Sequence, residues 1–89
     1  MKKEKFIELL VSEGFPEPIE VVRDKNSVTG PHSHAFEAKA FILEGQIDIV
    51  INNQRSVYLA GDIFHILANQ VHSESYGSKG VKYLVGRKE

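Results

Sequence analysis

Apolar residues near the start of the chain recur at the spacing of an α-helix. Lysine and glutamate occupy most of the other face, and the apolar positions are Phe6, Ile7, Leu10 and Val11. This pattern predicts a short amphipathic helix over residues 3–12. Gly14 stands where a helix commonly ends, and the two prolines of residues 15–18 cannot continue one because proline lacks an amide donor.

From residue 19 onward the pattern changes to that of short strands. Ile47, Ile49 and Ile51 recur at every second position, which is the period of a half-buried strand. Asn52-Asn53 then offers residues that tolerate the left-handed backbone of a tight hairpin. Further strands are predicted over residues 19–24, 36–43, 55–59, 63–67, 71–76 and 81–85, with breaks at 44–45, 60–62, 69–70 and 77–78. Many short strands with no helix between them indicate an all-β sandwich or closed barrel.

The size and composition of the chain restrict what it can do. Its 89 residues leave room for one domain. We divide this domain into an N-terminal helix (1–15), packed on the barrel or at a dimer interface, and the barrel itself (16–89). The absence of cysteine excludes disulfides, cysteine-zinc sites and thiol nucleophiles, so a metal must be bound by histidine, carboxylate or water. The formal net charge of -1 gives no electrostatic reason to expect nucleic acid as a partner.

No segment of the chain predicts contact with a membrane. The longest apolar run, residues 40–43, is far shorter than the roughly 20 residues that span a bilayer. The lysine-rich start lacks the apolar core of a signal peptide, and we therefore expect a cytoplasmic protein. We also expect a homodimer, because pairing covers the edge strands of a small barrel and the apolar face of the helix could contact a second subunit.

Two histidines two residues apart are candidate metal ligands. Side chains at positions i and i+2 of an extended segment lie on the same face, roughly 7 Å apart, so the rings of His32 and His34 could converge on one ion. Two surface histidines beside a turn fit the same spacing equally well. The chain contains no Ser-His-Asp order, phosphate-binding loop or dinucleotide fingerprint, so an enzymatic function would depend on the metal.

Two segments of the chain resemble the two motifs of the small single-domain cupins, and together they cover residues 30–76. The residues that carry the resemblance are His32, His34, Glu37 and Gly45 for the first motif and Gly61, Asn69 and His72 for the second. The resemblance implies a double-stranded β-helix (jelly-roll) barrel with a divalent metal held by three histidines, His32, His34 and His72. Imidazole ligands suit Zn, Fe, Ni, Cu and, less well, Mn, so they do not identify the metal.

Two further residues are candidates for completing this site. The resemblance places the family's glutamate ligand at Ala38 or Lys39, but the nearest carboxylate is Glu37, which a regular strand would turn away from the histidine pair. A bulge at residues 35–36 would turn Glu37 inward; without one, Glu37 is a solvent-facing charge. His65 lies between two apolar residues and faces either the cavity, as a ligand or proton shuttle, or the outside of the barrel.

The sequence leaves two main classes of function open. One is a metal-dependent enzyme of the dioxygenase or isomerase type, as the resemblance implies, acting on a small polar molecule. The other is a non-enzymatic barrel that binds or senses a small molecule, with a structural metal or none; a scaffold whose histidines bind nothing is a third. An enzyme needs an open coordination position on the metal, whereas a structural metal is fully coordinated by the protein.

Overall fold

The computed structural model describes residues 2–89. Its elements, in chain order, are α1 (Lys3–Ser12), β1 (Ile19–Arg23), β2 (Val28–His32), β3 (Glu37–Ile51), β4 (Gln54–Leu59), β5 (Ile63–Ile66) and β6 (His72–Lys88). The predicted helix coincides with α1. The predicted hairpin turn is also confirmed, because Asn52 and Asn53 have φ angles of 51° and 64° between β3 and β4. No helix within residues 2–89 is long and apolar enough to cross a membrane.

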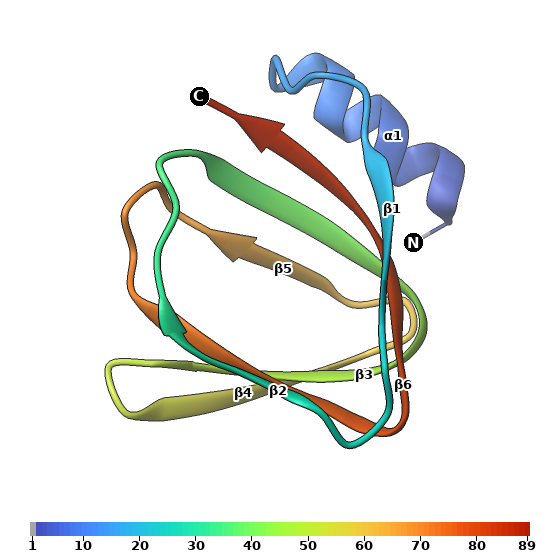
Figure 1. Cartoon of the computed structure of the whole chain (residues 1–89). Coiled ribbons are helices and arrows are strands. Elements are labelled where there is room, and N and C mark those ends of the chain that lie inside the picture. Colours follow the sequence, from blue (N-terminus) through green and yellow to red (C-terminus); the bar gives the residue numbers. More distant parts are fainter. Residues whose placement is uncertain (1) are drawn as a thin grey trace.

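The strands form two antiparallel layers that share the long strands β3 and β6. In one layer the order is β1-β6-β3-β5, and in the other it is β2-β6-β3-β4. Figure 1 shows β5 in the upper part of the molecule and β2 and β4 in the lower part, with β3 and β6 bending between them. The predicted all-β jelly-roll barrel with a short N-terminal helix is therefore confirmed.

Two of the predicted strand breaks are wrong. Residues 44–45 lie inside β3 and residues 77–78 inside β6, and the ladder between these strands changes register on both sides of Gly45. Gly45 and Gly80 have φ angles of 83° and 73°, and a Cβ atom on Gly45 would overlap the carbonyl oxygen of Gly80. Glycine allows the two strands to bend and to approach closely here, so the pairing continues through the bend.

The strand β2 was not predicted from the hydrophobic pattern. It pairs with the start of β6, where Thr29 lies opposite Glu74 and His32 lies opposite His72, with a register irregularity between the two pairs. Pro31 is tolerated inside β2 because this is an edge strand, on which a missing amide hydrogen breaks no ladder bond. The pairing of β2 with β6 brings the first cupin-like motif next to the second.

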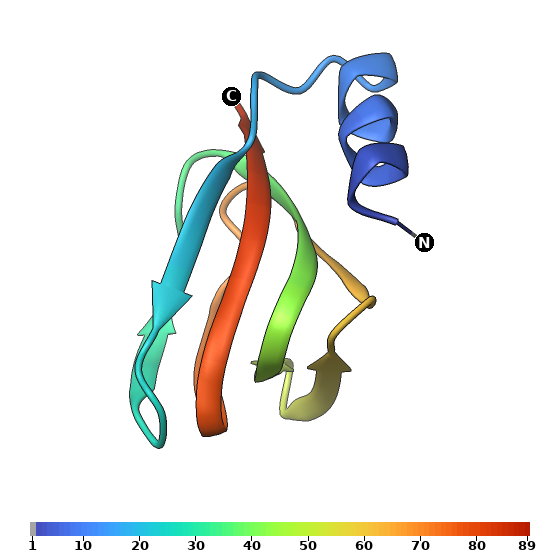
Figure 2. The ribbon, with the colours of Figure 1, turned by 90° about the vertical axis from the view of Figure 1, so that its right-hand side faces the viewer.

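Apolar residues separate into a core between the two layers and a smaller cluster outside them. The inner core contains Val21, Ala38, Ala40, Ile42, Ile47, Ile49, Phe64, Ile66, Tyr76, Val81, Tyr83 and Val85. Phe41 and Leu84 face the other side of their layer, where they pack against the fully buried Phe6 and Leu10 of α1. The rings of Phe6 and Phe41 are stacked with centroids 5.4 Å apart, and Figure 2 shows the helix alongside the strands of this layer.

Candidate metal centre

Three histidines from separate parts of the chain lie together beside the inner core. His32 ends β2, His72 begins β6 directly opposite it, and His34 follows in the loop before β3. Their ligand nitrogens all lie within 4.8 Å of one another, and the ring centroids of His32 and His72 are 4.2 Å apart. The structure thus brings together the three histidines that the two motifs singled out.

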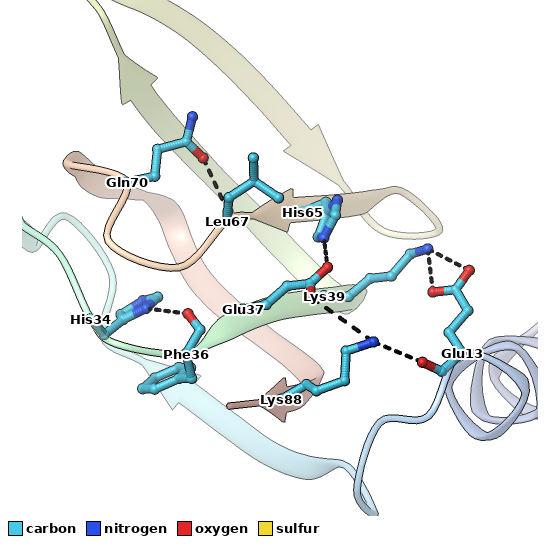
Figure 3. Close-up of polar contacts among 9 residues, drawn as sticks. All are labelled: Glu13, His34, Phe36, Glu37, Lys39, His65, Leu67, Gln70 and Lys88. Atoms are coloured by element: carbon cyan, nitrogen blue, oxygen red, sulfur yellow. Dashed lines mark hydrogen bonds and ion pairs between the residues drawn. The ribbon is translucent and has the colours of Figure 1, made fainter.

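The loop of the second motif also holds the loop of the first. The backbone N–H of Asn69 donates a 2.7 Å hydrogen bond to the carbonyl of His34, and Asn69 has a φ of 62°, which asparagine tolerates. The side-chain oxygen of Gln70 accepts a 3.1 Å hydrogen bond from the backbone N–H of Leu67, which closes the same loop (Figure 3). Residues 67–70 therefore position His34 as well as His72.

Each of the three rings is oriented by a hydrogen bond from its Nδ1 atom. The acceptors are the carbonyl oxygens of Gly30, Phe36 and Gln70, at 2.8 Å from His32, 3.2 Å from His34 and 2.9 Å from His72. A carbonyl oxygen can only accept, so Nδ1 carries the proton in every ring. In a neutral ring, Nε2 then carries the free lone pair. Hydrogen bonds made by Nδ1 impose the same arrangement on metal-binding histidines.

His72 shows why a cation fits this position. Its side chain is 0% exposed, and its Nε2 is a buried atom with no hydrogen-bond partner within residues 2–89. Leaving a buried polar atom unsatisfied costs roughly 1–3 kcal/mol, and a metal bound to Nε2 would remove that cost. The three imidazoles therefore fit a divalent ion of the zinc or transition-metal type.

The protonation of His34 favours the same interpretation. Burial lowers the pKa of His34 below its usual value, and the hydrogen bond to the Phe36 carbonyl opposes this shift only in part. The neighbouring rings of His72 and His32 lower the pKa of His34 further, and the carboxylate of Glu74 raises it by a smaller amount. A lowered pKa favours the neutral ring, which is the form that binds a metal.

A carboxylate that sequence reasoning missed, Glu74, faces the three histidines. Its Oε2 atom lies 3.3 Å from Nε2 of His72 and 3.5 Å from Nε2 of His32, and its side chain is only 13% exposed. Its Oε1 atom accepts a 3.0 Å hydrogen bond from the hydroxyl of Tyr76, which lies 2.6 Å from Oγ1 of Thr29. Glu74 follows His72 at spacing i+2 on one strand, so the alternation used for His32 and His34 could have found it.

A cavity of about 120 Å³ opens beside these residues. Besides apolar core residues, its wall contains the polar side chains Arg23, Thr29, Glu74, Tyr76, Tyr83 and Arg87. Burial raises the pKa of Tyr83 to about 12 and also raises the pKa of Tyr76. Both hydroxyls therefore keep their protons at neutral pH. The hydroxyl of Tyr76 donates its proton to Glu74, whereas that of Tyr83 can donate a hydrogen bond into the cavity.

The family model described as "Cupin domain" matches residues 19–85. The chain belongs to the cupin family. A comparison with curated protein sequences gave no match.

Solved structures with the same cupin fold include proteins of several kinds. An RmlC-like cupin from Shewanella frigidimarina is 18% identical, with 82% of this chain and 66% of that chain covered and a TM-score of 0.68. The DMSP lyase DddQ from Ruegeria pomeroyi is 18% identical (79% and 36% covered, TM-score 0.71). The polyketide cyclase RemF from Streptomyces resistomycificus is 23% identical (79% and 52% covered, TM-score 0.66). This cupin thus spans between about a third and two thirds of those chains, and the likeness shows the shared fold alone.

The two remaining candidate ligands of this cupin, Glu37 and His65, lie outside the histidine group. Strand β3 begins at Glu37 with no bulge before it, and Ala38 faces the core, so alternation turns Glu37 outward. There Oε2 of Glu37 lies 2.5 Å from Nε2 of His65, and Lys88 approaches the same carboxylate (Figure 3). The bulge that would have turned Glu37 inward is absent, because the chain at residues 35–36 is a loop, and the outward alternative holds.

Proposed function

We propose that this cupin binds one divalent metal ion through Nε2 of His32, His34 and His72, and that its cavity binds a small polar or anionic molecule next to that ion. The observation that carries the proposal is the convergence of three oriented imidazoles around the buried, unpartnered Nε2 of His72. A bound divalent metal would supply a Lewis acid that polarises an oxygen donor of the ligand.

The charges of the cavity wall support an anionic group on that molecule. Arg23 and Arg87 line the cavity, and neither forms an ion pair with a carboxylate of residues 2–89. The guanidinium of Arg87 lies 5.2 Å from the ring centroid of Phe36, which holds its planar group in place. Two guanidinium groups against the single carboxylate of Glu74 leave an excess of positive charge, which favours an anion.

We further propose that this cupin is an enzyme. Structural neighbours of this cupin include proteins described as a DMSP lyase and as a polyketide cyclase, so the barrel can carry catalysis of more than one kind. In this chain the protonated hydroxyl of Tyr83 would bind and orient a ligand oxygen, and the buried wall would exclude water. We infer a reaction on a small polar substrate, of the dioxygenase or isomerase type.

The test is the metal content of protein purified without a histidine tag and without chelator, followed by calorimetric titration of the metal-free protein with Zn²⁺, Mn²⁺, Fe²⁺ and Ni²⁺. We expect about one equivalent of metal. His34→Ala combined with His72→Ala should abolish binding, whereas His65→Ala is the matched control and should leave it unchanged because His65 faces outward. Binding by the double variant at full stoichiometry, or no uptake by the natural chain, would refute the proposal.

A further inference from the structure

We propose that Glu74 supplies the anionic ligand of the metal centre, from the second strand position after His72 and not from the first motif. This inference rests on the proposed metal site and names a ligand that the cupin motifs do not. It is carried by four observations: the spacing of the donor atoms, the orientation of the two histidine rings, the support of the second carboxylate oxygen, and the engagement of Glu37 elsewhere.

The spacing of the donor atoms suits a shared ion. Oε2 of Glu74 lies 3.3 Å from Nε2 of His72 and 3.5 Å from Nε2 of His32. Two donors that are each about 2.1 Å from one ion lie about 3.0–3.5 Å apart when the angle between them is between a right angle and the tetrahedral angle. One carboxylate oxygen is therefore at coordination distance from the same point as two of the three imidazoles.

The orientation of the two rings also directs their second ring nitrogens at the Glu74 carboxylate. Nδ1 of His32 and Nδ1 of His72 donate to backbone carbonyls, so in the neutral rings both Nε2 atoms present lone pairs to the carboxylate. Nε2 of His72 has no hydrogen-bond partner among the described residues, and the side chain of Glu74 is largely shielded from water. A divalent ion at this point would contact the carboxylate and both ring nitrogens at once.

The other oxygen of Glu74 is held in place by a hydrogen-bonded chain. An ionised carboxylate can only accept, so the Tyr76 hydroxyl donates to Oε1 at 3.0 Å, and the hydroxyl of Thr29 then donates to Tyr76 at 2.6 Å. Outer hydrogen bonds of this kind orient metal ligands and are typical of metal centres. Together with the Nδ1 hydrogen bonds of the three histidines, these hydrogen bonds fix the orientation of all four proposed ligands.

The alternative carboxylate, Glu37, is engaged on the opposite side of its strand. It is paired with His65 and approached by Lys88, and it follows the alternation that places Ala38 in the core. Glu74 instead lies across the ladder from Thr29 in β2, two residues from His72. The proposed glutamate ligand therefore lies in β6, whereas the first cupin motif would place it in β3. The donor atom is a carboxylate oxygen in both cases.

The experiment compares the metal affinity of Glu74→Gln with that of Glu37→Gln, an isosteric change of the same charge at the other glutamate. Affinities for Zn²⁺ and Co²⁺ are measured by competition with a chromophoric chelator, and folding is checked by circular dichroism in EDTA. We expect Glu74→Gln to weaken binding by at least tenfold and Glu37→Gln to change it by less than about twofold. Tyr76→Phe should weaken binding several-fold, because it removes the support of Oε1.

The visible spectrum of the Co²⁺-loaded protein provides a second readout, because its bands depend on the donor atoms. The bands should shift in Glu74→Gln and stay unchanged in Glu37→Gln. Equal affinity and an unchanged spectrum in Glu74→Gln, with binding still lost in His34→Ala plus His72→Ala, would overturn the role of Glu74 and leave the three-histidine site standing. Failure of the natural chain to bind any of these ions would instead overturn both proposals.

Discussion

Binding of a divalent metal is expected to raise the thermal stability of this protein, and chelation is expected to lower it. Without an ion, the fully buried Nε2 of His72 has no hydrogen-bond partner in the part of the chain that the structure describes, and the carboxylate of Glu74 lies 3.3 Å from it. An unsatisfied buried nitrogen destabilises the folded state, and an ion bound to it would remove that cost. The unfolded chain holds no preformed site, so the ion binds the folded state preferentially.

The size of the effect follows from this linkage. Free metal at 100 times its dissociation constant stabilises the folded state by about 2.7 kcal/mol. In a domain of this size each kcal/mol moves the melting temperature by about 4–8 °C, so the midpoint should rise by about 10–20 °C between EDTA and saturating metal. The cost of the unpaired His72 nitrogen, roughly 1–3 kcal/mol, is of the same order.

Thermal unfolding followed by circular dichroism, in EDTA and in a series of metal concentrations, measures this shift. His65→Ala should show the full shift, since this residue pairs with Glu37 outside the site. His34→Ala combined with His72→Ala should show none. An unchanged midpoint of the natural chain in excess Zn²⁺, Mn²⁺, Fe²⁺ and Ni²⁺ would show that the histidines do not form a metal site, and the reasoning from the unpaired nitrogen would be refuted.

Three further predictions concern the scaffold that holds the site. Phe6→Ala should lower the free energy of unfolding in urea by about 3–5 kcal/mol, because it empties a fully buried position under α1; a loss below 1 kcal/mol would mean that the helix contributes little. Gly45→Ala should destabilise far more than Gly61→Ala, since both have positive φ but only Gly45 is crowded; equal losses would contradict the account of the bend. The raised pKa of Tyr83, about 12, means that its proton stabilises the fold fully below pH 10 and ceases to do so as the pH rises from about 10 towards 12. The natural chain should therefore lose up to about 3 kcal/mol more than Tyr83→Phe over that range in urea titrations, and parallel losses would refute this.

Local sequence signals predicted the parts of this fold that depend on neighbouring residues. The spacing of Phe6 and Leu10 indicated a helix with one buried face, and both side chains are buried under it. The alternation around Ile47 and Ile49 indicated a strand with one face in the core, and both residues belong to the inner core. Asn52-Asn53 indicated a tight turn because asparagine tolerates positive φ.

Local signals failed where two distant strands decide the outcome. The glycine at 45 reads as a strand end, because glycine weakens isolated strands, yet the long ladder between β3 and β6 holds the chain through the bend. The face of Glu37 depended on where β3 begins, since a shift of one residue reverses every side chain of a strand.

The sequence by itself thus determined the all-β class, the helix and the turn residues, because each follows from the spacing of side chains along the chain. The grouping of His32, His34 and His72 was implied by the resemblance to the cupin motifs. Only the tertiary structure decided which donors meet. The pairing of β2 with β6 places His32 opposite His72 and brings Glu74 to both. That encounter depends on the register between strands that are 40 residues apart in sequence (His32 and His72), and such register is set by core packing across the whole barrel.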